Sequence, residues 1–149
     1  MQLKRRALGA LAGLLTVASL GGTAIGADRA YTEGTVSSVS AVRTEPGMFD
    51  AYMAYLAGPY KQIMESAKAA GLVVDYRVYA TTPRSPADPD VYLITTYKNM
   101  AAMDGLQDKM EPLQEKVQGD EATRTAKTIE RGKMREMIGS QLIRKLELK

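Results

Sequence analysis

Two kinds of periodicity alternate along residues 34–148, and their order constrains the fold more than any other feature of the sequence. Side chains that alternate in character, as in strands, occupy the ranges 34–43, 72–80, 90–98 and 141–148. Apolar side chains spaced three and four residues apart, as on one helix face, occupy 49–70, 103–117 and, more weakly, 121–137. This order predicts an α+β fold of the ferredoxin-like, split βαβ type. Such a fold has a four-stranded antiparallel sheet with its helices on one face.

Glycine, proline and asparagine residues mark the ends of these segments. Gly58 and Pro59 interrupt the first helical stripe without changing its phase, so we expect a kink whose two halves pack on one surface. Gly71 lies where a C-terminal glycine cap belongs. Three prolines within residues 81–89 predict a loop, and Asn99 is a suitable N-cap for the next helix.

The first 27 residues have the layout of a secretory signal peptide. Basic residues at positions 4–6 precede an uncharged, mostly apolar run at 7–20, and small residues follow. The run is shorter than the roughly 20 apolar residues of a membrane-spanning helix, and glycines interrupt it. We therefore expect cleavage after Gly26 or Ala27, no membrane anchor afterwards, and a periplasmic or secreted protein.

Removal of the signal leaves a short flexible leader, residues 28–33, and a single α+β domain, residues 34–149. Three of the 20 basic residues and none of the 17 acidic residues lie in the signal, so the mature chain has equal numbers of both. A chain without net basic charge has no general attraction for a phosphate backbone. We expect no nucleic-acid partner.

The chain contains no cysteine and no histidine. This composition excludes disulfides, thiolate catalysis, serine–histidine triads and metal or haem sites that depend on histidine. Met103 and Met110 lie on a helical apolar stripe, which favours core packing over a copper site. We expect neither a cofactor nor a metal.

A four-stranded sheet with helices on one side leaves its other face uncovered. In this sequence that face would carry several apolar and aromatic side chains, whose exposure costs about 25 cal/mol per Å². Because two such faces can cover each other, we expect a homodimer.

The element order resembles the dimeric α+β barrel superfamily, as does the run Tyr97-Lys98-Asn99-Met100 that leads from the third strand into a helix. That superfamily includes the antibiotic-biosynthesis monooxygenases and NIPSNAP-like proteins, and the resemblance covers residues 34–148. It implies that two subunits form a barrel, with ligands between sheet and helices or inside the barrel. Haem-degrading members use a His and a Trp and peroxidase-type members a His, and neither residue type occurs here. The quinone-forming monooxygenases need no metal and are not excluded.

One side of the second predicted strand carries the most suggestive polar group. The candidate ligand-binding residues are Asp75, Arg77 and Tyr79 on that side, Tyr92 or Tyr97 on the third strand, and Tyr55 on the first helix. A pocket of tyrosines and arginine suits an anionic or phenolic compound, with Arg77 pairing a carboxylate. The alternative is that Asp75 and Arg77 form a structural ion pair between strands or between subunits.

Another group of charges lies near the C-terminus. Arg131, Lys133 and Arg135 are offset by Glu130 and Glu136, which predicts a solvated helix face.

Three functions remain open at this point. The first is an exported dimer that binds a small organic ligand. The second is a cofactor-independent monooxygenase or isomerase acting in the same cavity, and the third is a structural or partner-binding dimer. No catalytic residue is assigned, because without His or Cys the candidates are residue types abundant on ordinary surfaces.

Overall fold

The computed structural model of the chain describes residues 29–149, so the predicted signal peptide and Asp28 lie outside the described residues. The elements are β1 (Tyr31–Thr44), α1 (Phe49–Tyr55), the π-helical turn η1 (Leu56–Tyr60), α2 (Lys61–Ala69), β2 (Asp75–Ala80), β3 (Val91–Tyr97), the 3-10 turn η2 (Met100–Met103), α3 (Leu106–Gln118), α4 (Glu121–Gly132) and β4 (Arg135–Leu148). The strands form one antiparallel sheet in the order β2-β3-β1-β4. Because β3 lies between β1 and β2 and runs opposite to both, the predicted split βαβ topology is confirmed.

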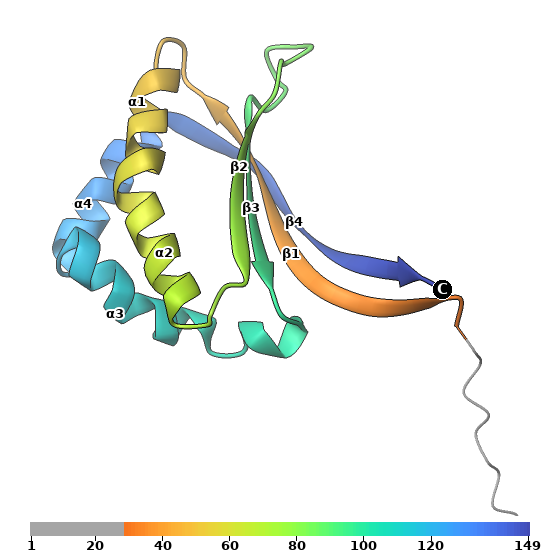
Figure 1. The fold of residues 1–149 in the computed structure, drawn as a ribbon. Helices are drawn as coiled ribbons and strands as arrows, with labels where there is room; N and C mark the ends of the chain where they lie inside the picture. Colours follow the sequence, from red (N-terminus) through yellow and green to blue (C-terminus); the bar gives the residue numbers. More distant parts are fainter. Residues whose placement is uncertain (1–28) are drawn as a thin grey trace, which may run out of the picture.

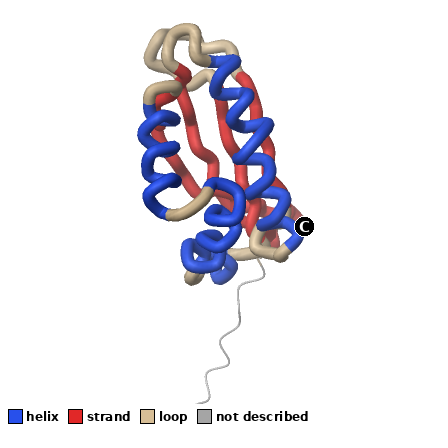
Figure 2. Tube along the Cα trace, turned by 90° about the vertical axis from the view of Figure 1, so that its left-hand side faces the viewer, coloured by secondary structure: helices blue, strands red, loops and turns tan. Residues whose placement is uncertain are grey.

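The helices α1 to α4 cover one face of the sheet and leave the other face bare, as predicted (Figures 1 and 2). Two clusters of buried side chains join the layers. The first contains Val42, Tyr52, Leu56 and Val91, and the second contains Met64, Ala67, Val73 and Tyr97. Burial of this apolar surface is the main force that holds the helices on the sheet.

No helix within residues 29–149 combines the length and the apolar character that a membrane span requires.

The predicted kink in the first helix is present. Gly58 leaves the helical region with φ −98° and ψ −106°, and Pro59 has no N–H to donate, so the chain makes one wider turn before α2 begins. Leu56 before the turn and Met64 after it are both buried toward the sheet. The apolar face therefore keeps its phase across the interruption. Gly71 then ends the helix with a left-handed φ of 71°, as expected of a C-terminal cap.

The first strand starts earlier than the sequence predicted. Residues 31–33, expected in the flexible leader, belong to β1 and pair with the end of β4. β3 covers β1 only from Val36 to Val42. The rest of β1 and β4 continues as a curved two-stranded ribbon, seen at the right of Figure 1. We call residues 31–35 and 144–148 the β1–β4 arm.

The boundary between the last helix and the last strand also differs. A helix over 121–137 and a strand from residue 141 were expected, but α4 ends at Gly132 and β4 begins at Arg135. The end of β1 offers residues 135–137 ladder hydrogen bonds. Strand pairing therefore overrides the local helical preference.

The second strand begins at Asp75, three residues later than predicted. Val73 packs in the core against Ala67, whereas Val74 is exposed, so both depart from the expected alternation. The amide N–H of Leu72 donates to the carbonyl of Ala67 at 2.9 Å. Leu72 is therefore still hydrogen-bonded to α2 and does not yet belong to the strand.

Candidate functional site

The register of the sheet assigns each strand residue to one of two faces. Val36 pairs with Tyr97 and Val42 with Val91, and these four side chains are buried beneath the helices. Because successive strand residues point to opposite faces, alternate positions lie on the bare side. We call these the helix-side face and the open face.

Four of the six predicted site residues lie on the open face. Tyr79 pairs with Tyr92, and Asp75 and Arg77 occupy the preceding open-face positions of β2. Arg77 Nε donates to Asp75 Oδ2 at 2.8 Å, and this bond lowers the pKa of the Asp75 carboxyl. The Arg77 side chain is 64% exposed. The two charges thus pair with each other within one strand, whereas the alternative above placed the ion pair between strands or subunits.

The other two predicted residues lie on the opposite side of the sheet. Tyr97 is buried in the core with Met64 and Val73, and burial raises the pKa of its phenol. Tyr55 is a half-buried residue of α1. A single chain therefore does not bring the six residues to one place, and their binding role stays a prediction.

The open face has a hollow of about 300 Å³ over β3, β1 and β4. Val39, Ala41, Tyr92 and Ile138 line it together with residues 139–141 of β4. Tyr92 is the one predicted site residue that contributes to it.

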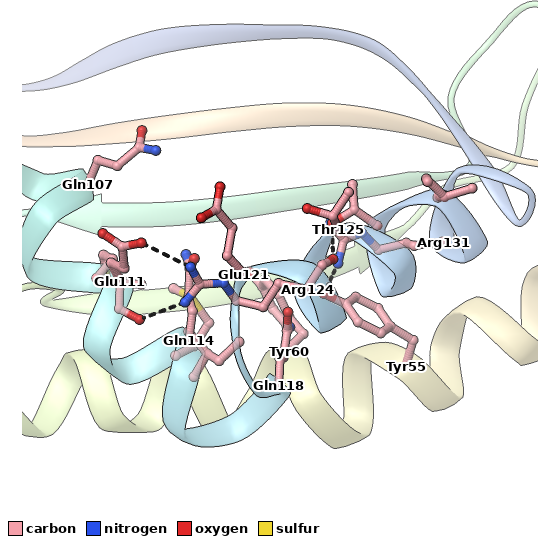
Figure 3. Close-up of a pocket in the computed structure, with 15 residues that line it drawn as sticks. Tyr55, Tyr60, Gln107, Glu111, Gln114, Gln118, Glu121, Arg124, Thr125 and Arg131 are labelled. Carbon is pink, nitrogen blue, oxygen red and sulfur yellow. Dashed lines mark hydrogen bonds and ion pairs between the residues drawn. The ribbon is translucent and has the colours of Figure 1, made fainter.

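A larger cavity of about 530 Å³ lies on the helix side, between α4 and the pair α2 and α3 (Figure 3). We call it the α4 groove. Its apolar lining is Ile63, Met64, Met110 and Ile129, and its polar lining is Tyr55, Tyr60, Gln107, Glu111, Gln114, Gln118, Glu121, Arg124, Thr125, Thr128 and Arg131. Ile63 and Met64 are buried and form its floor.

The helix α4 lies against the rest of the protein without burying any of its own residues. Its largest apolar side chain, Ile129, is 60% exposed although it lines the groove. An amphipathic helix is normally held by burial of its apolar face. This helix therefore leaves apolar surface uncovered along the groove.

Polar contacts hold α4 in place instead. Arg124 Nη2 lies 2.9 Å from Glu111 Oε1 of α3, and these two side chains face each other across the groove in Figure 3. Lys127 Nζ donates to the backbone carbonyl of Gln118 at 2.8 Å. The Arg124 side chain is only 15% exposed, so its ion pair is better shielded from water than the Asp75–Arg77 pair.

The far end of the groove is closed by a contact between α4 and α1. Arg131 Nη1 donates to the Tyr55 hydroxyl at 2.8 Å, and the guanidinium carbon lies 5.0 Å from the centre of the same ring. Arg131 Nη2 also donates to the Thr128 hydroxyl at 3.2 Å. The Tyr55 ring stacks on Tyr52 with a centroid separation of 6.1 Å. Arg131 retains N–H donors beyond these two bonds that can meet an acceptor.

Beneath the groove lies a tyrosine whose hydroxyl has no hydrogen-bond partner among the described residues. The Tyr60 hydroxyl is buried, and its ring meets the Tyr76 ring edge-on at 6.0 Å. Burial is the largest cause that raises the pKa of Tyr60 to about 12. The phenol is therefore neutral at physiological pH.

Sequence reasoning missed most of the groove. Arg131 was expected on a solvated helix face, but it contacts Tyr55, and Arg135 belongs to β4 rather than to a helix. One signal was available, because Arg124, Thr128 and Arg131 recur at spacings of four and three along α4. This spacing places the three side chains on one face of the helix.

Within residues 29–149, aspartate and glutamate side chains do not gather in groups of three or more that could hold a metal ion.

Comparison with known proteins does not identify a family. No family model matches the chain, and no curated protein matches it closely enough to count as a relative. A solved structure, the crystal structure of HapK from Hahella chejuensis, is similar with a TM-score of 0.46 and 14% sequence identity, over 72% of this chain and 90% of HapK. At this distance the similarity identifies neither a ligand nor a reaction. Membership of the dimeric α+β barrel superfamily stays a prediction.

Proposed function

We propose that the protein is exported and binds a small organic molecule in the α4 groove. The observation that carries this proposal is the combination of a 530 Å³ cavity with a bordering helix that buries none of its residues. Ligand sites usually have volumes of about 300–1,000 Å³, an apolar lining and a few convergent polar groups. A molecule seated on Met64 and Met110 would cover Ile129 and supply the packing that α4 lacks.

The polar lining favours a neutral or phenolic ligand over a strong anion. Two acidic and two basic side chains line the groove, and one of each, Glu111 and Arg124, already pair with one another. Three glutamines and two threonines supply neutral donors and acceptors. A planar, hydroxylated ring would lie on the apolar floor and exchange hydrogen bonds with this rim.

Two naphthalene compounds test the ligand class because they share one ring system. Fluorescence titration should show that 2-naphthol binds the mature protein more tightly than 2-naphthoate. Tighter binding of the carboxylate would contradict the charge argument and favour the anionic ligand that Arg77 was expected to bind.

Substitution of Ile129 tests the location of the site. The Ile129→Asn variant should bind 2-naphthol about tenfold more weakly, since it loses an apolar contact worth roughly 1–2 kcal/mol. The control Val74→Asn changes a similarly exposed residue outside the groove and should bind normally. If Arg77→Ala abolishes binding while Ile129→Asn does not, the site lies on the open face and the proposal is wrong.

Native mass spectrometry of the protein purified from its own periplasm tests export and occupancy together. A mass that lacks residues 1–26 or 1–27 and carries an organic adduct is the expected result. Oxygen consumption with bound phenols would then show monooxygenase activity, and its absence with retained binding would leave a binding protein.

A further inference from the structure

The two edges of the sheet differ in how they would meet another strand. β2 forms one edge with six residues, and the charged pair Asp75 and Arg77 lies on it. β4 forms the other edge with 14 residues, and all of them after Arg135 are exposed. Short, charged edge strands resist pairing with other chains, whereas long apolar ones invite it.

The edge strand β4 exposes apolar side chains on both of its faces. Ile143 lies on the open face opposite Ser37, and Leu142 lies on the helix-side face opposite Ser38. The exposed large apolar residues of β4 are Met137, Ile138, Leu142, Ile143, Leu146 and Leu148. A second sheet stacked on the open face would leave Leu142 and the leucines of the β1–β4 arm uncovered. A strand placed alongside β4 would instead bring neighbouring side chains to both faces.

The charged residues of β4 do not prevent such an approach, because most of them are paired within their own chain. Glu136 pairs with Arg43, and Arg144 pairs with Glu33. Lys145 Nζ lies 2.9 Å from Glu147 of the same strand. From residue 136 to residue 148, this edge therefore lacks the unpaired inward charges that protect natural edge strands.

We infer that β4 pairs antiparallel with β4 of a second copy of this chain, so that the two sheets form one continuous sheet. An isologous contact needs a self-complementary surface, and the charge order along β4 provides one. Antiparallel pairing brings Glu136, near the start of one strand, toward the basic stretch Arg144–Lys145 near the end of the other. Parallel pairing would place like charges side by side. Equal numbers of acidic and basic residues in the mature chain mean that two copies do not repel one another.

The absence of cysteine makes the edge testable by single introduced thiols. Ser140→Cys, Gln141→Cys, Leu142→Cys and Ile143→Cys are exported, purified and oxidised mildly. Light scattering should give twice the mature mass, and disulfide dimers should form at one or two neighbouring positions, because Cβ atoms must lie within about 4.5 Å. Arg77→Cys on the β2 edge and Val39→Cys on the open face should not cross-link.

A charged variant provides the second measurement. Leu142→Lys combined with Ile143→Lys places two like charges at each copy's edge and should weaken association at least tenfold. Circular dichroism confirms that the variant is folded, since both residues are exposed. A monomer at micromolar concentration, cross-linking at Val39→Cys alone, or a charged variant that remains dimeric would each overturn the inference. Binding of 2-naphthol is measured in the same samples, so a failure of the groove is distinguished from a failure of the edge.

Discussion

The two faces of the sheet come from the same strands and differ in almost every physical respect. Val91 is fully buried on the helix-side face, and its neighbour Tyr92 lies half-buried on the open face. The helix-side face supports two core clusters and, beyond them, the α4 groove. The open face carries a smaller hollow and an exposed ion pair.

The contrast between the two faces shows which polar side chains indicate a ligand site. Asp75 and Arg77 satisfy each other in water, so their presence on a strand requires no ligand. Around the groove, Arg124 is shielded from water and its ion pair holds α4, a helix that has no buried residues. The incomplete packing of α4, rather than the polar character of β2, is what a bound molecule would correct.

The largest expected effect comes from comparing two tyrosines, one on each side of the sheet. Tyr52→Ala should lower the free energy of unfolding by roughly 3–5 kcal/mol, because it removes a fully buried aromatic side chain. Tyr79→Ala removes a ring that is 50% exposed on the open face and should change it by less than about 0.5 kcal/mol. Urea denaturation measures both. A large loss for Tyr79→Ala would show that the open face is covered in solution.

A second pair uses the same residue type on one strand. Val42→Ala should cost about 2 kcal/mol, because Val42 is fully buried in the first core cluster. Val39→Ala changes an open-face residue that pairs with Ile94, and we expect a loss below about 1 kcal/mol. The comparison is repeated at two protein concentrations. Destabilisation by Val39→Ala that depends on concentration would indicate face-to-face pairing and would contradict the edge interface.

The third test concerns the unpaired hydroxyl of Tyr60 below the groove. Unlike the first two substitutions, its removal should stabilise the protein. Tyr60→Phe removes a buried group without a partner and should raise the free energy of unfolding by about 1 kcal/mol at neutral pH.

The pH dependence of stability supplies a further measurement on the same residue. Because the pKa of Tyr60 rises from 10.0 to about 12 on folding, the folded protein holds the phenol proton more tightly than the unfolded chain does. The stability that comes from this difference is fully present below pH 10 and is lost as pH rises toward 12. Urea denaturation across this range should show a shallower decline for Tyr60→Phe than for the natural chain. An equally steep decline would mean that Tyr60 does not titrate with a raised pKa.

Much of the fold could be predicted because its determinants are local. The four-and-three spacing of the first helix, the Gly58-Pro59 interruption and the Gly71 cap all carry their physical reasons in neighbouring residues. The end of α4 could not be placed in this way. Its residues after Gly132 pair with the end of β1 about 90 positions earlier, and no local pattern reports that pairing.

The candidate site was less accessible for the same reason. The contact between Arg131 and Tyr55 joins residues 76 positions apart, and the sequence showed only a charged helix. The alternation in β2 correctly grouped Asp75, Arg77 and Tyr79 on one face, and an ion pair was the stated alternative, but the sequence could not tell that this pair lies within one strand. Strand alternation separates two faces without showing which of them borders a cavity.

The smallest expected effect belongs to Arg77 and decides between the two faces. Arg77→Ala should leave the urea midpoint and the affinity for 2-naphthol unchanged in both low-salt and high-salt buffer, because Arg77 is largely exposed and water replaces its half of the ion pair. The pKa of Asp75 should rise toward its ordinary value, since the Arg77 hydrogen bond is the largest cause of its lowering, and carboxyl NMR titration measures this. A variant that shows the pKa change and nothing else confirms a solvated pair. A variant that loses 2-naphthol would instead show that Arg77 contacts the ligand, and the open face would then be the binding surface.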